Sequence, residues 1–460
     1  RAFAWDAANR RLYVGGQFAT AGGVTVGALG LWDGATWSAL GTGMNSAVLA
    51  LAWDSANARL LAGGGFTTAG GVSAARVAAW DGSAWSALGS GMESSVLVLA
   101  LDSASGRLFA GGTFTVAGGN AGSVVAAWDG SAWSKLGSGM TGGVLDVVWD
   151  SARSRLYIGG DFLTAGNVAA RRVAMWNGSA WSGLGTGING SVFALALDPA
   201  TGGLYAAGQF AQAGGLTANN VAMWDGSAWL ALGDGVDGGV SALAHDPVRD
   251  RLFVGGSFQN AGGAPAIRLA LWDGVAWSPL GGGANNFVWG LAWDDAGRRL
   301  YVGGDFTRVG GQVGHIAQLQ FGAPQTITFA TPGAQAFGTT PTLSASASSG
   351  LAVTFASATT GVCTVTAGGV LAFVATGTCS IRAEQGGGSG FDSAPAVTQS
   401  FSVNASLPGA PRTPAAFALD TEAVVFFAVP LSNGGASITS YTVTSSPGGV
   451  TATGPATGIL

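Results

Sequence analysis

The chain has 460 residues, of which 9% are charged and 80 are glycine; it is too long for one compact core and too rich in glycine for long helices. Its net charge of −5 and its single lysine, Lys135, exclude the basic surface that binding to nucleic acid or to an anionic membrane requires. No apolar run reaches the roughly 18 residues of a membrane-spanning helix, so we expect no membrane insertion.

A repeat with a period of 48 residues begins at the first residues and continues to about residue 320. Its clearest mark is the phenylalanine of a GG-x-F motif (AG-x-F in the fifth unit), found at Phe18, Phe66, Phe114, Phe162, Phe210, Phe258 and Phe306. A W-D/N-G turn keeps the same register, with its tryptophan at Trp32, Trp80, Trp128, Trp176, Trp224 and Trp272. A second tryptophan follows five residues later in each of these six units. Columns in register over so many units indicate a repeat architecture.

Each unit has the pattern of four short strands. In the second unit we predict strands at 48–54, 59–66, 77–81 and 84–91. The first is a continuous apolar run, which is typical of a strand covered on both faces, and Asp-Gly between the last two favours a tight hairpin. Four strands in 48 residues match one propeller blade. The predicted fold is therefore all-β, a seven-bladed β-propeller over residues 1–322.

The seventh unit is shorter than the others. Gln320 stands where the period predicts a tryptophan, and no fourth strand precedes Gly322. Arg1 lies within a first strand, so we expect the missing outer strand, like any targeting signal, to lie upstream of the sequence given.

The pattern LYVGG-x-F…AGG…VA-x-W-D-G-x-x-W-x-x-LG resembles kelch-like propellers and looks most similar to the extracellular repeats of cortical cell-polarity marker proteins. The resemblance covers about residues 1–322. It implies an extracellular propeller.

Beyond Gln325 the repeat gives way to short strands separated by turns, which predict β-sandwich modules. We place an Ig-like domain at 323–405 and a truncated fibronectin type III module at 406–460, because these segments resemble bacterial versions of both. Cys363 and Cys379 flank a Gly-Gly turn, and we predict a disulfide that bridges this hairpin; the alternative is two buried free thiols. A disulfide implies an oxidising compartment.

Groups for catalysis are scarce. The chain has two histidines, His245 and His315, and the first replaces a packing residue of the first-strand column. Nucleophile elbows, phosphate-binding loops and zinc motifs are missing from the sequence. We therefore predict that the chain is not an enzyme and has no metal site and no cofactor.

Recurring polar and aromatic residues have a structural interpretation. Six of the seven first-strand aspartates have an arginine five residues later, which predicts a locked hairpin in each blade; a repeated ligand site is the alternative. The tryptophan columns are interpreted as wedges between blades, with sugar stacking as the alternative.

Positions that vary inside this strict frame are the candidate binding residues. The x of GG-x-F is charged or amide-bearing at Gln17, Asp161, Gln209 and Asp305, and the position after AGG, which in the seventh unit is Ile316, is arginine at Arg76, Arg172 and Arg268. We expect these residues to lie on one rim or in the central channel; neutral drift on a solvated rim is the alternative.

The sequence therefore predicts a secreted or cell-surface binding or adhesion protein. The propeller would present a loop-lined face to a protein or glycan partner, and the sandwich modules would form a stalk. A carbohydrate-active enzyme that uses the channel and a purely structural envelope component are the alternatives.

Overall fold

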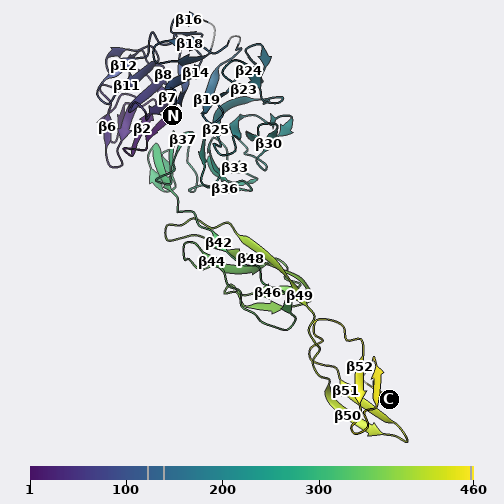
Figure 1. Cartoon of the computed structure of the whole chain (residues 1–460). Coiled ribbons are helices and arrows are strands. Elements are labelled where there is room, and N and C mark those ends of the chain that lie inside the picture. Colours follow the sequence, from purple (N-terminus) through teal and green to yellow (C-terminus); the bar gives the residue numbers. More distant parts are fainter. Residues whose placement is uncertain (122–123, 138–139, 456–457, 460) are drawn as a thin grey trace. The chain divides into compact units, whose positions relative to one another are not determined.

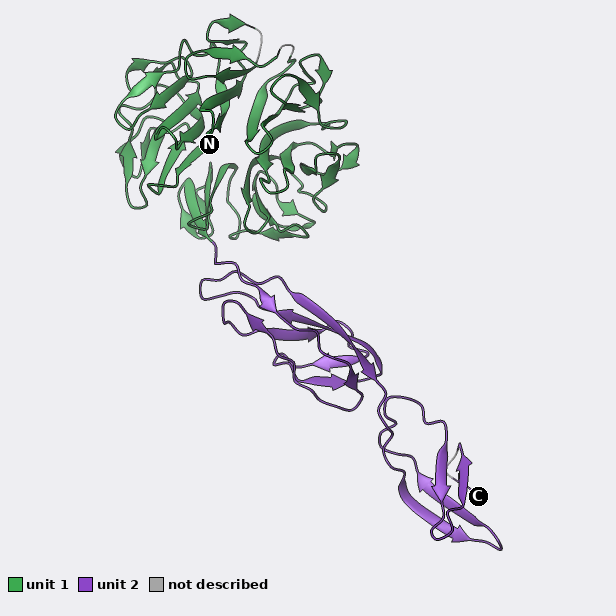
Figure 2. Cartoon of the chain, viewed as in Figure 1, with its two compact units in different colours: residues 1–320 green, residues 321–460 purple. Residues whose placement is uncertain are grey.

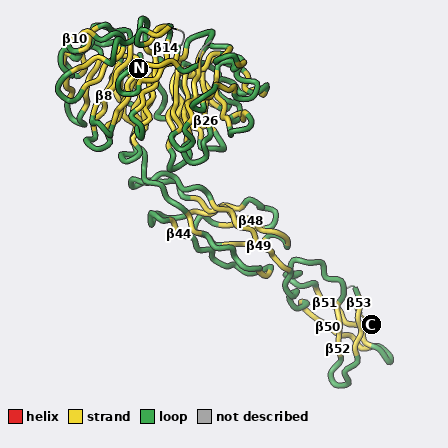
Figure 3. The backbone as a smooth tube through the Cα atoms, turned by 45° about the horizontal axis from the view of Figure 1, so that its top comes forward, coloured by secondary structure: helices red, strands yellow, loops and turns green. Residues whose placement is uncertain are grey.

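The structure is a computed structural model that describes residues 1–460 except 122–123, 138–139, 456–457 and 460. Its described residues form strands, turns and loops (Figure 3). None of the described segments is a helix long and apolar enough to cross a membrane. The chain separates into two compact units, residues 1–320 and 321–460 (Figure 2), which are described separately below.

Seven antiparallel sheets make up the described part of the first unit, and each sheet is one blade of a ring (Figure 1). The first strands line the inside of the ring: β1 (Ala2–Asp6), β7 (Val48–Asp54), β13 (Val96–Asp102), β19 (Val144–Asp150), β25 (Ser191–Leu197), β31 (Val240–Asp246) and β37 (Val288–Asp294). The second strands are β2 (Arg11–Gly15), β8 (Arg59–Gly64), β14 (Arg107–Gly112), β20 (Arg155–Gly160), β26 (Leu204–Gln209), β32 (Arg251–Gly256) and β38 (Arg299–Gly304). Each sheet therefore starts with the long apolar strand that the sequence places first.

The outer half of each blade is shorter. The third strands are β5 (Leu29–Trp32), β11 (Val77–Trp80), β17 (Val125–Trp128), β23 (Val173–Trp176), β29 (Val221–Trp224), β35 (Leu269–Trp272) and β41 (Ile316–Gln320). Six blades have a fourth strand in the described residues: β6 (Trp37–Ala39), β12 (Trp85–Ala87), β18 (Trp133–Lys135), β24 (Trp181–Gly183), β30 (Trp229–Ala231) and β36 (Trp277–Pro279). The seventh blade has three strands, in the order β37-β38-β41.

A small two-stranded hairpin lies between the second and third strand of every blade. The hairpins are β3 (Thr20–Ala21) with β4 (Val24–Thr25), β9 (Thr68–Ala69) with β10 (Val72–Ser73), β15 (Val116–Ala117) with β16 (Asn120–Ala121), β21 (Thr164–Ala165) with β22 (Val168–Ala169), β27 (Gln212–Ala213) with β28 (Leu216–Thr217), β33 (Asn260–Ala261) with β34 (Ala264–Pro265), and β39 (Arg308–Val309) with β40 (Gln312–Val313). The sequence prediction of four strands per unit did not include these hairpins.

The ring closes between blades 7 and 1, because β1 contacts β37 as well as β7. The rings of Trp5 and Tyr301 lie 5.6 Å apart across this junction. Phe3 fills the space above Gly303, where a β-carbon would lie 2.6 Å from its ring. The seven-bladed all-β fold predicted from the period is therefore confirmed.

Hydrophobic cores form between neighbouring blades, and they explain the Gly-Gly of the GG-x-F motif. A β-carbon on Gly63 would lie 2.6 Å from Val96 of the next blade. A β-carbon on Gly64 would lie 2.2 Å from the carbonyl oxygen of Ala47. In blade 2 both positions favour glycine because the neighbouring blade and the incoming connection approach the backbone closely; in blade 5 the first of the two positions is Ala207.

In units 2 to 6 the second tryptophan joins its blade to the preceding one. Trp133 is 3% exposed, and its indole Nε1–H donates to the carbonyl of Leu88, at 2.8 Å. The same bond recurs from Trp85 to Leu40, from Trp181 to Leu136, from Trp229 to Leu184 and from Trp277 to Leu232. These buried, hydrogen-bonded rings are wedges between blades, as predicted, and not an exposed stacking platform.

The seventh blade corrects the predicted register. Leu252 pairs with Trp272 in blade 6, whereas Leu300 pairs with Leu319 in blade 7. The loop before β41 is thus one residue shorter than the constant period assumes. Leu319, and not Gln320, occupies the tryptophan position, and its side chain lies against Gly281 as Trp272 lies against Gly233.

The second unit is a series of small sheets. Its strands are β42 (Ile327–Thr328), β43 (Gln335–Ala336), β44 (Ser346–Ala347), β45 (Thr354–Ser357), β46 (Cys363–Val365), β47 (Leu371–Phe373), β48 (Gly377–Glu384), β49 (Val397–Asn404), β50 (Arg412–Ala418), β51 (Ala423–Ala428), β52 (Tyr441–Thr444), β53 (Thr451–Gly454) and β54 (Gly458–Ile459). The strands from β42 to β49 share one apolar core. The unit begins at residue 321, and the further predicted division at residue 405 stays a prediction.

Cys363 and Cys379 form a disulfide, as predicted. The bond does not bridge one hairpin, however, because Cys363 lies in β46, which pairs with β47, and Cys379 lies in β48, which pairs with β45 and β49. The disulfide therefore links two sheets through the core of the module. Both cysteines are 0% exposed.

Candidate functional site

The two ends of the blades form different faces of the ring. We call the turn face the end that carries the turns between first and second strands (54–59 in blade 2) and the W-D-G turns (80–85). We call the loop face the end that carries the GG-x-F loops (65–76) and the connections between blades (88–95). The antiparallel order of strands within each blade separates these two sets of segments.

Each complete first strand contains a β-bulge at the loop face. The register of β7 against β8 shifts between Val48 and Ala50, which leaves Leu49 as the extra residue. The same shift recurs in β13, β19, β25, β31 and β37. The residues at this position, all partly exposed, are Leu49, Leu97, Leu145, Phe193, Ser241 and Trp289. A bulge redirects a side chain out of the ladder, and here five of the six side chains so placed are large and apolar.

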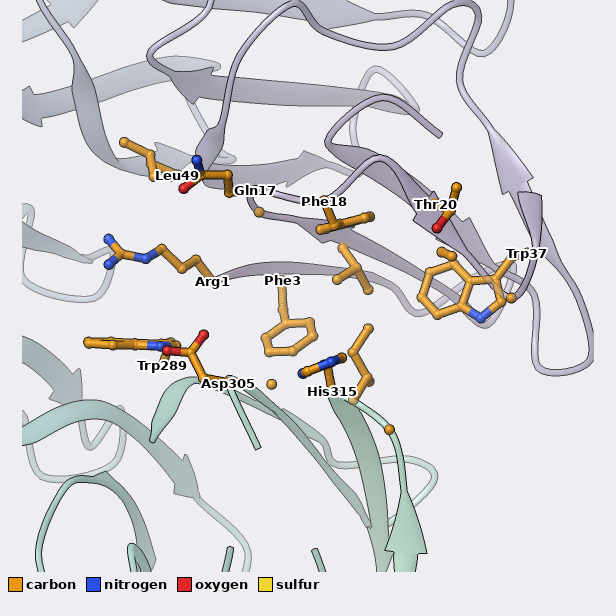
Figure 4. A pocket seen from close by; sticks show the side chains of 18 of the residues that line it. Arg1, Phe3, Gln17, Phe18, Thr20, Trp37, Leu49, Trp289, Asp305 and His315 are labelled. Carbon is orange, nitrogen blue, oxygen red and sulfur yellow. The ribbon is translucent and has the colours of Figure 1, made fainter. Parts of the chain in front are cut away.

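A pocket of about 880 Å³ opens where this position meets the junction of blades 7 and 1. Its inner part is lined by Arg1, Gln17, Leu49, Trp289 and Asp305 (Figure 4). The Arg1 guanidinium lies 4.9 Å from the centre of the Trp289 ring. This inner part, which we call the axial mouth, therefore combines an aromatic platform with a cation and an exposed carboxylate.

Phe287 extends the aromatic surface beside the mouth. Its ring centre lies 5.7 Å from that of Trp289, and the side chain is 40% exposed. An exposed phenylalanine thus lies beside a partly exposed tryptophan, and together they present apolar ring surface to solvent.

The predicted site residues lie on the loop face. Gln17, Asp161, Gln209 and Asp305 are all exposed and lie at the ends of the second strands of their blades, Gln209 as the last residue of β26 and the other three just beyond the strand. Two of them, Gln17 and Asp305, line the pocket. Asp161 and Gln209 belong to blades 4 and 5, on the same face but outside this pocket.

The arginine column lies opposite these residues in the same loops. In blade 2 the backbone of Arg76 donates to Phe66 and accepts from Gly64, and in blade 4 Arg172 makes the same pair with Phe162 and Gly160. Asp161 and Arg172 therefore lie on opposite sides of the same loop. The prediction that both columns lie on one rim agrees with this geometry, and their role in binding stays a prediction.

The arginine side chains also have structural partners. Arg268 donates to the carbonyl of Ala284, at 3.1 Å, and Arg76 donates to the carbonyl of Glu93, at 3.4 Å. Both carbonyls belong to the connection that leads into the next blade. In this column the backbone is left-handed at Ala28, Arg76, Arg172, Asn220 and Arg268, with φ between 61° and 73°. Glycine would adopt this conformation with the least strain. These positions therefore carry side chains although their backbone conformation favours glycine.

The shortened loop of blade 7 changes one member of this column. Gly304 donates to the carbonyl of His315, as Gly256 donates to that of Arg268. His315, and not Ile316, therefore occupies the arginine position of blade 7, and it lines the pocket. A constant period could not have placed His315 there.

Asp146 is a residue that the sequence interpretation missed. It follows the bulge of β19 and accepts hydrogen bonds from the backbone N–H of Val147 at 2.9 Å and of Leu195, in the next blade, at 2.6 Å. Desolvation raises the pKa of its carboxyl to about 7, against the lowering effect of these two bonds. The column offered a signal, since its other members are all small and apolar: Ala2, Ala50, Val98, Ala194, Ala242 and Gly290.

The turn face repeats one motif around the ring. Asp54 is 0% exposed and accepts from the backbone N–H of Asn57 and from Arg59 Nε, at 3.2 and 2.8 Å. Burial raises the pKa of Asp54, but the bonds from Asn57 and Arg59 outweigh it and leave the pKa below its usual value.

The predicted pairing of each aspartate with the arginine five residues later is confirmed for only some of the blades. It is present for Asp54, Asp246 and Asp294. Asp150 pairs with Arg153, and Asp6 and Asp102 accept hydrogen bonds from Asn9 and Ser105. The aspartate holds the turn in each case, because its carboxylate reaches N–H and side-chain donors within the next three residues, whereas the donor side chain varies.

His245 behaves as a packing residue with one polar contact. Its ring lies 5.5 Å from that of Tyr205, and Nε2 lies 3.1 Å from Asp250 Oδ1. In the part of the chain that the structure describes, no three His, Cys, Asp or Glu residues form a group that could hold a metal ion.

Comparison of the chain with protein-family models and with curated proteins gave no match in either case.

Proposed function

We propose that the chain is a non-enzymatic binding or adhesion protein that holds a protein or glycan partner on the loop face of the propeller. The observation that carries the proposal is the bulge position. In six blades it turns one side chain out of the ladder, and these side chains include Phe193 and Trp289, which are both partly exposed.

The chemistry of the axial mouth supports this function. Trp289 and Phe287 offer flat apolar surfaces, on which an aliphatic or aromatic side chain or the apolar face of a sugar ring can stack. Asp305 and Gln17, at the same pocket, can accept hydrogen bonds from hydroxyl or amide groups. Rigid blades hold these groups, so little entropy is lost on binding.

The proposed setting is the cell surface or the extracellular space. A disulfide buried in the core of the second unit is stable in an oxidising compartment. The kelch-like pattern of the repeat and the resemblance of the second unit to bacterial Ig-like and fibronectin type III modules support the same setting. In this proposal the second unit is a stalk.

The test is a binding array of glycans and extracellular-matrix proteins, probed with the full chain and with Trp289→Ala. We expect saturable binding to a component of the array that weakens about tenfold or more in the variant, the usual effect of removing a central aromatic anchor.

Val275→Ser is the matched control, because Val275 is 86% exposed in a W-D-G turn of the turn face. Its binding should equal that of the unmodified chain. Equal losses in both variants, or no saturable binding to any component, would refute the proposal; the second result would favour a structural role.

A further inference from the structure

The innermost strands of the blades turn backbone N–H groups toward the central channel of the ring. In blade 5 the N–H of Asp198 donates to the carbonyl of Gly203, at 2.8 Å. Hydrogen-bonded pairs alternate along an antiparallel ladder, so Leu195, three residues earlier, belongs to a pair whose N–H and carbonyl groups point away from β26. Because β25 is the innermost strand of its blade (Figure 1), the Leu195 N–H faces the channel.

This channel-facing N–H is repeated around the ring. The pair of Leu195 with Ala206 has equivalents in the pairs Leu51 with Ala62, Leu99 with Ala110, Val147 with Ile158, Leu243 with Val254 and Leu291 with Val302. Each first member lies two positions after the bulge residue of its strand, which places its N–H about 5–7 Å further into the channel. Leu243 and Leu291 are partly exposed although they lie in innermost strands, so solvent reaches this level of the channel.

Between blades 4 and 5 a carboxylate of the chain itself occupies two of these N–H groups. One oxygen of Asp146 accepts from the N–H of Val147, at 2.9 Å, and the other accepts from the N–H of Leu195, at 2.6 Å. The carboxylate therefore bridges two neighbouring first strands. The bridge needs two acceptor atoms on one small planar group, one for each blade. Asp146 thus shows which chemistry fits between two neighbouring channel N–H groups.

Between blades 6 and 7 the equivalent donors have no such acceptor. Ala242 stands at the position of the bridging aspartate, and its methyl group cannot accept a hydrogen bond. In the part of the chain that the structure describes, no side chain accepts from the N–H of Leu243 or Leu291. The bulge residues at the loop-face entrance to this junction are Ser241 and Trp289, both partly exposed. They place a hydroxyl group and a flat aromatic surface above the two free N–H groups.

The other junctions among blades 2 to 7 lack this combination. Between blades 3 and 4, and between blades 5 and 6, one of the two N–H groups already donates to Asp146. Between blades 2 and 3 the N–H groups of Leu51 and Leu99 lie below the bulge residues Leu49 and Leu97, whose side chains have no polar group and no ring. Among these junctions, as far as the structure describes them, the one between blades 6 and 7 joins two available donors to an aromatic and polar entrance.

We propose that the channel between blades 6 and 7 binds a small organic acid, with its carboxylate on the N–H groups of Leu243 and Leu291 and its apolar body against Trp289. Each carboxylate oxygen accepts from one blade, as in the Asp146 bridge. The ligand has an apolar body because the bulge residues that surround the entrance are mostly leucine and aromatic residues. This inference does not depend on the proposed function, since a free acid occupies the channel whether or not a macromolecule binds the loop face.

The test uses the 460-residue chain and 3-phenylpropionate, in which two methylene groups separate an aromatic ring from a carboxylate. Calorimetry measures binding, and the backbone amide NMR signals of Leu243 and Leu291 report where it occurs. We expect saturable binding that shifts these two signals. 3-Phenylpropionamide has one acceptor oxygen in place of two and should bind about tenfold more weakly, the usual effect of losing a charge-assisted hydrogen bond. Trp289→Ala should weaken binding of the acid about fivefold through the loss of ring stacking.

Ala242→Asp copies the Asp146 bridge at this junction and should abolish binding, because the new carboxylate takes both N–H groups. Ala50→Asp is the matched control, since it places the same group between blades 2 and 3 and should leave binding unchanged; thermal unfolding shows that both variants are folded. The inference fails if the acid does not bind saturably, if acid and amide bind equally well, if folded Ala242→Asp still binds, if both variants lose binding equally, or if the shifted signals lie outside blades 6 and 7. A negative result on the array of glycans and proteins bears on the proposed function and not on this site.

Discussion

The turn face and the loop face of the propeller are built by the same blades but differ in how strictly their residues repeat. On the turn face an aspartate holds each turn between the first and second strands. The W-D-G turns use Asp or Asn in all six units that have one: Asp33, Asp81, Asp129, Asn177, Asp225 and Asp273 each accept two backbone N–H bonds. On the loop face the backbone bonds repeat equally well, but the side chains change from blade to blade.

This difference separates residues that the scaffold requires from residues that it leaves free. Where a side chain satisfies buried backbone groups, its chemistry is fixed by the fold. Where only the main chain closes a loop, as between Phe162 and Arg172, the side chains can serve a partner. Stability and binding should therefore respond to different substitutions.

The largest stability effect is expected on the turn face, at Asp246. Its carboxylate is 0% exposed and pairs with Arg249 and Arg251, at 3.0 and 3.1 Å. Asp246→Ala leaves two nearly buried guanidinium groups without this partner and should lower the free energy of unfolding by about 3 kcal/mol. Urea unfolding measures the loss. Asp234→Ala, at an exposed aspartate of a loop-face connection, should change it by less than about 0.5 kcal/mol; similar values for the two variants would contradict the comparison.

A pH-dependent effect is expected at Asp146. Its folded pKa of about 7 lies above the ordinary value of 3.8, so the native state holds a proton that the unfolded state has lost, and this contribution to stability falls as pH rises from about 4 to 7. The full shift corresponds to about 4 kcal/mol. Because Asp146 is partly exposed, solvent screens its charge, and we expect about 1–2 kcal/mol. Asp146→Asn should remove this slope in thermal unfolding.

Asp129, on the turn face, is the control, because its pKa is shifted in the opposite direction and its effect on stability should depend on pH with the opposite sign. Bonds from the backbone of Ala132 and Ser131 lower its pKa to about 2, so its contribution is lost as pH falls from about 4 toward 2. If Asp146→Asn and Asp129→Asn altered stability in the same pH range, the opposite pKa shifts assigned to the two carboxyl groups would be wrong.

Substitutions at residues with a positive φ should change the free energy of unfolding by a smaller amount, and the sign of the change should differ between the two faces. Gly130, in a W-D-G turn, has φ of 103°, so Gly130→Ala should destabilise the chain by about 1–2 kcal/mol. Ala28, on the loop face, has φ of 69°, and Ala28→Gly should be neutral or stabilising by up to about 1 kcal/mol. Chemical denaturation of both variants tests this; a clear loss of stability in Ala28→Gly would show that its side chain is needed for the fold.

The smallest stability effect is expected at the exposed loop-face acids. Asp161→Lys and Asp305→Lys should each change the free energy of unfolding by less than about 0.5 kcal/mol, while reducing binding to the partner found on the array. Unchanged binding in the double variant would remove both acids from the site and leave the aromatic mouth.

Much of the fold could be predicted from the sequence because a repeat multiplies weak signals. A single GG-x-F or W-D-G says little, but seven units in register define blades, turns and wedges. Gly63 shows the reason: the close approach of the next blade, here through Val96, recurs around the ring, and six of the seven units have glycine at this position while the fifth has alanine. The site could be predicted only in part. The loop-face columns stood out as variable positions, whereas the bulge position did not, since a bulge adds a residue without changing the period. Asp146 differs from the small apolar residues of its column, but only the structure shows that its carboxylate is desolvated and bonded to the next blade.

The sequence by itself determined the blade: its four strands, its tryptophan wedge, its aspartate turns and the cysteine pair of the second unit. These are set by local turn chemistry and by contacts that recur at a fixed spacing. Tertiary structure alone decided what happens where the repeat is interrupted. Only the pairing of β38 with β41 revealed the missing loop residue that brings His315 and Leu319 into place, and only ring closure put Arg1 over Trp289. Contacts between the first and last blades join residues about 300 positions apart, and no periodicity encodes them.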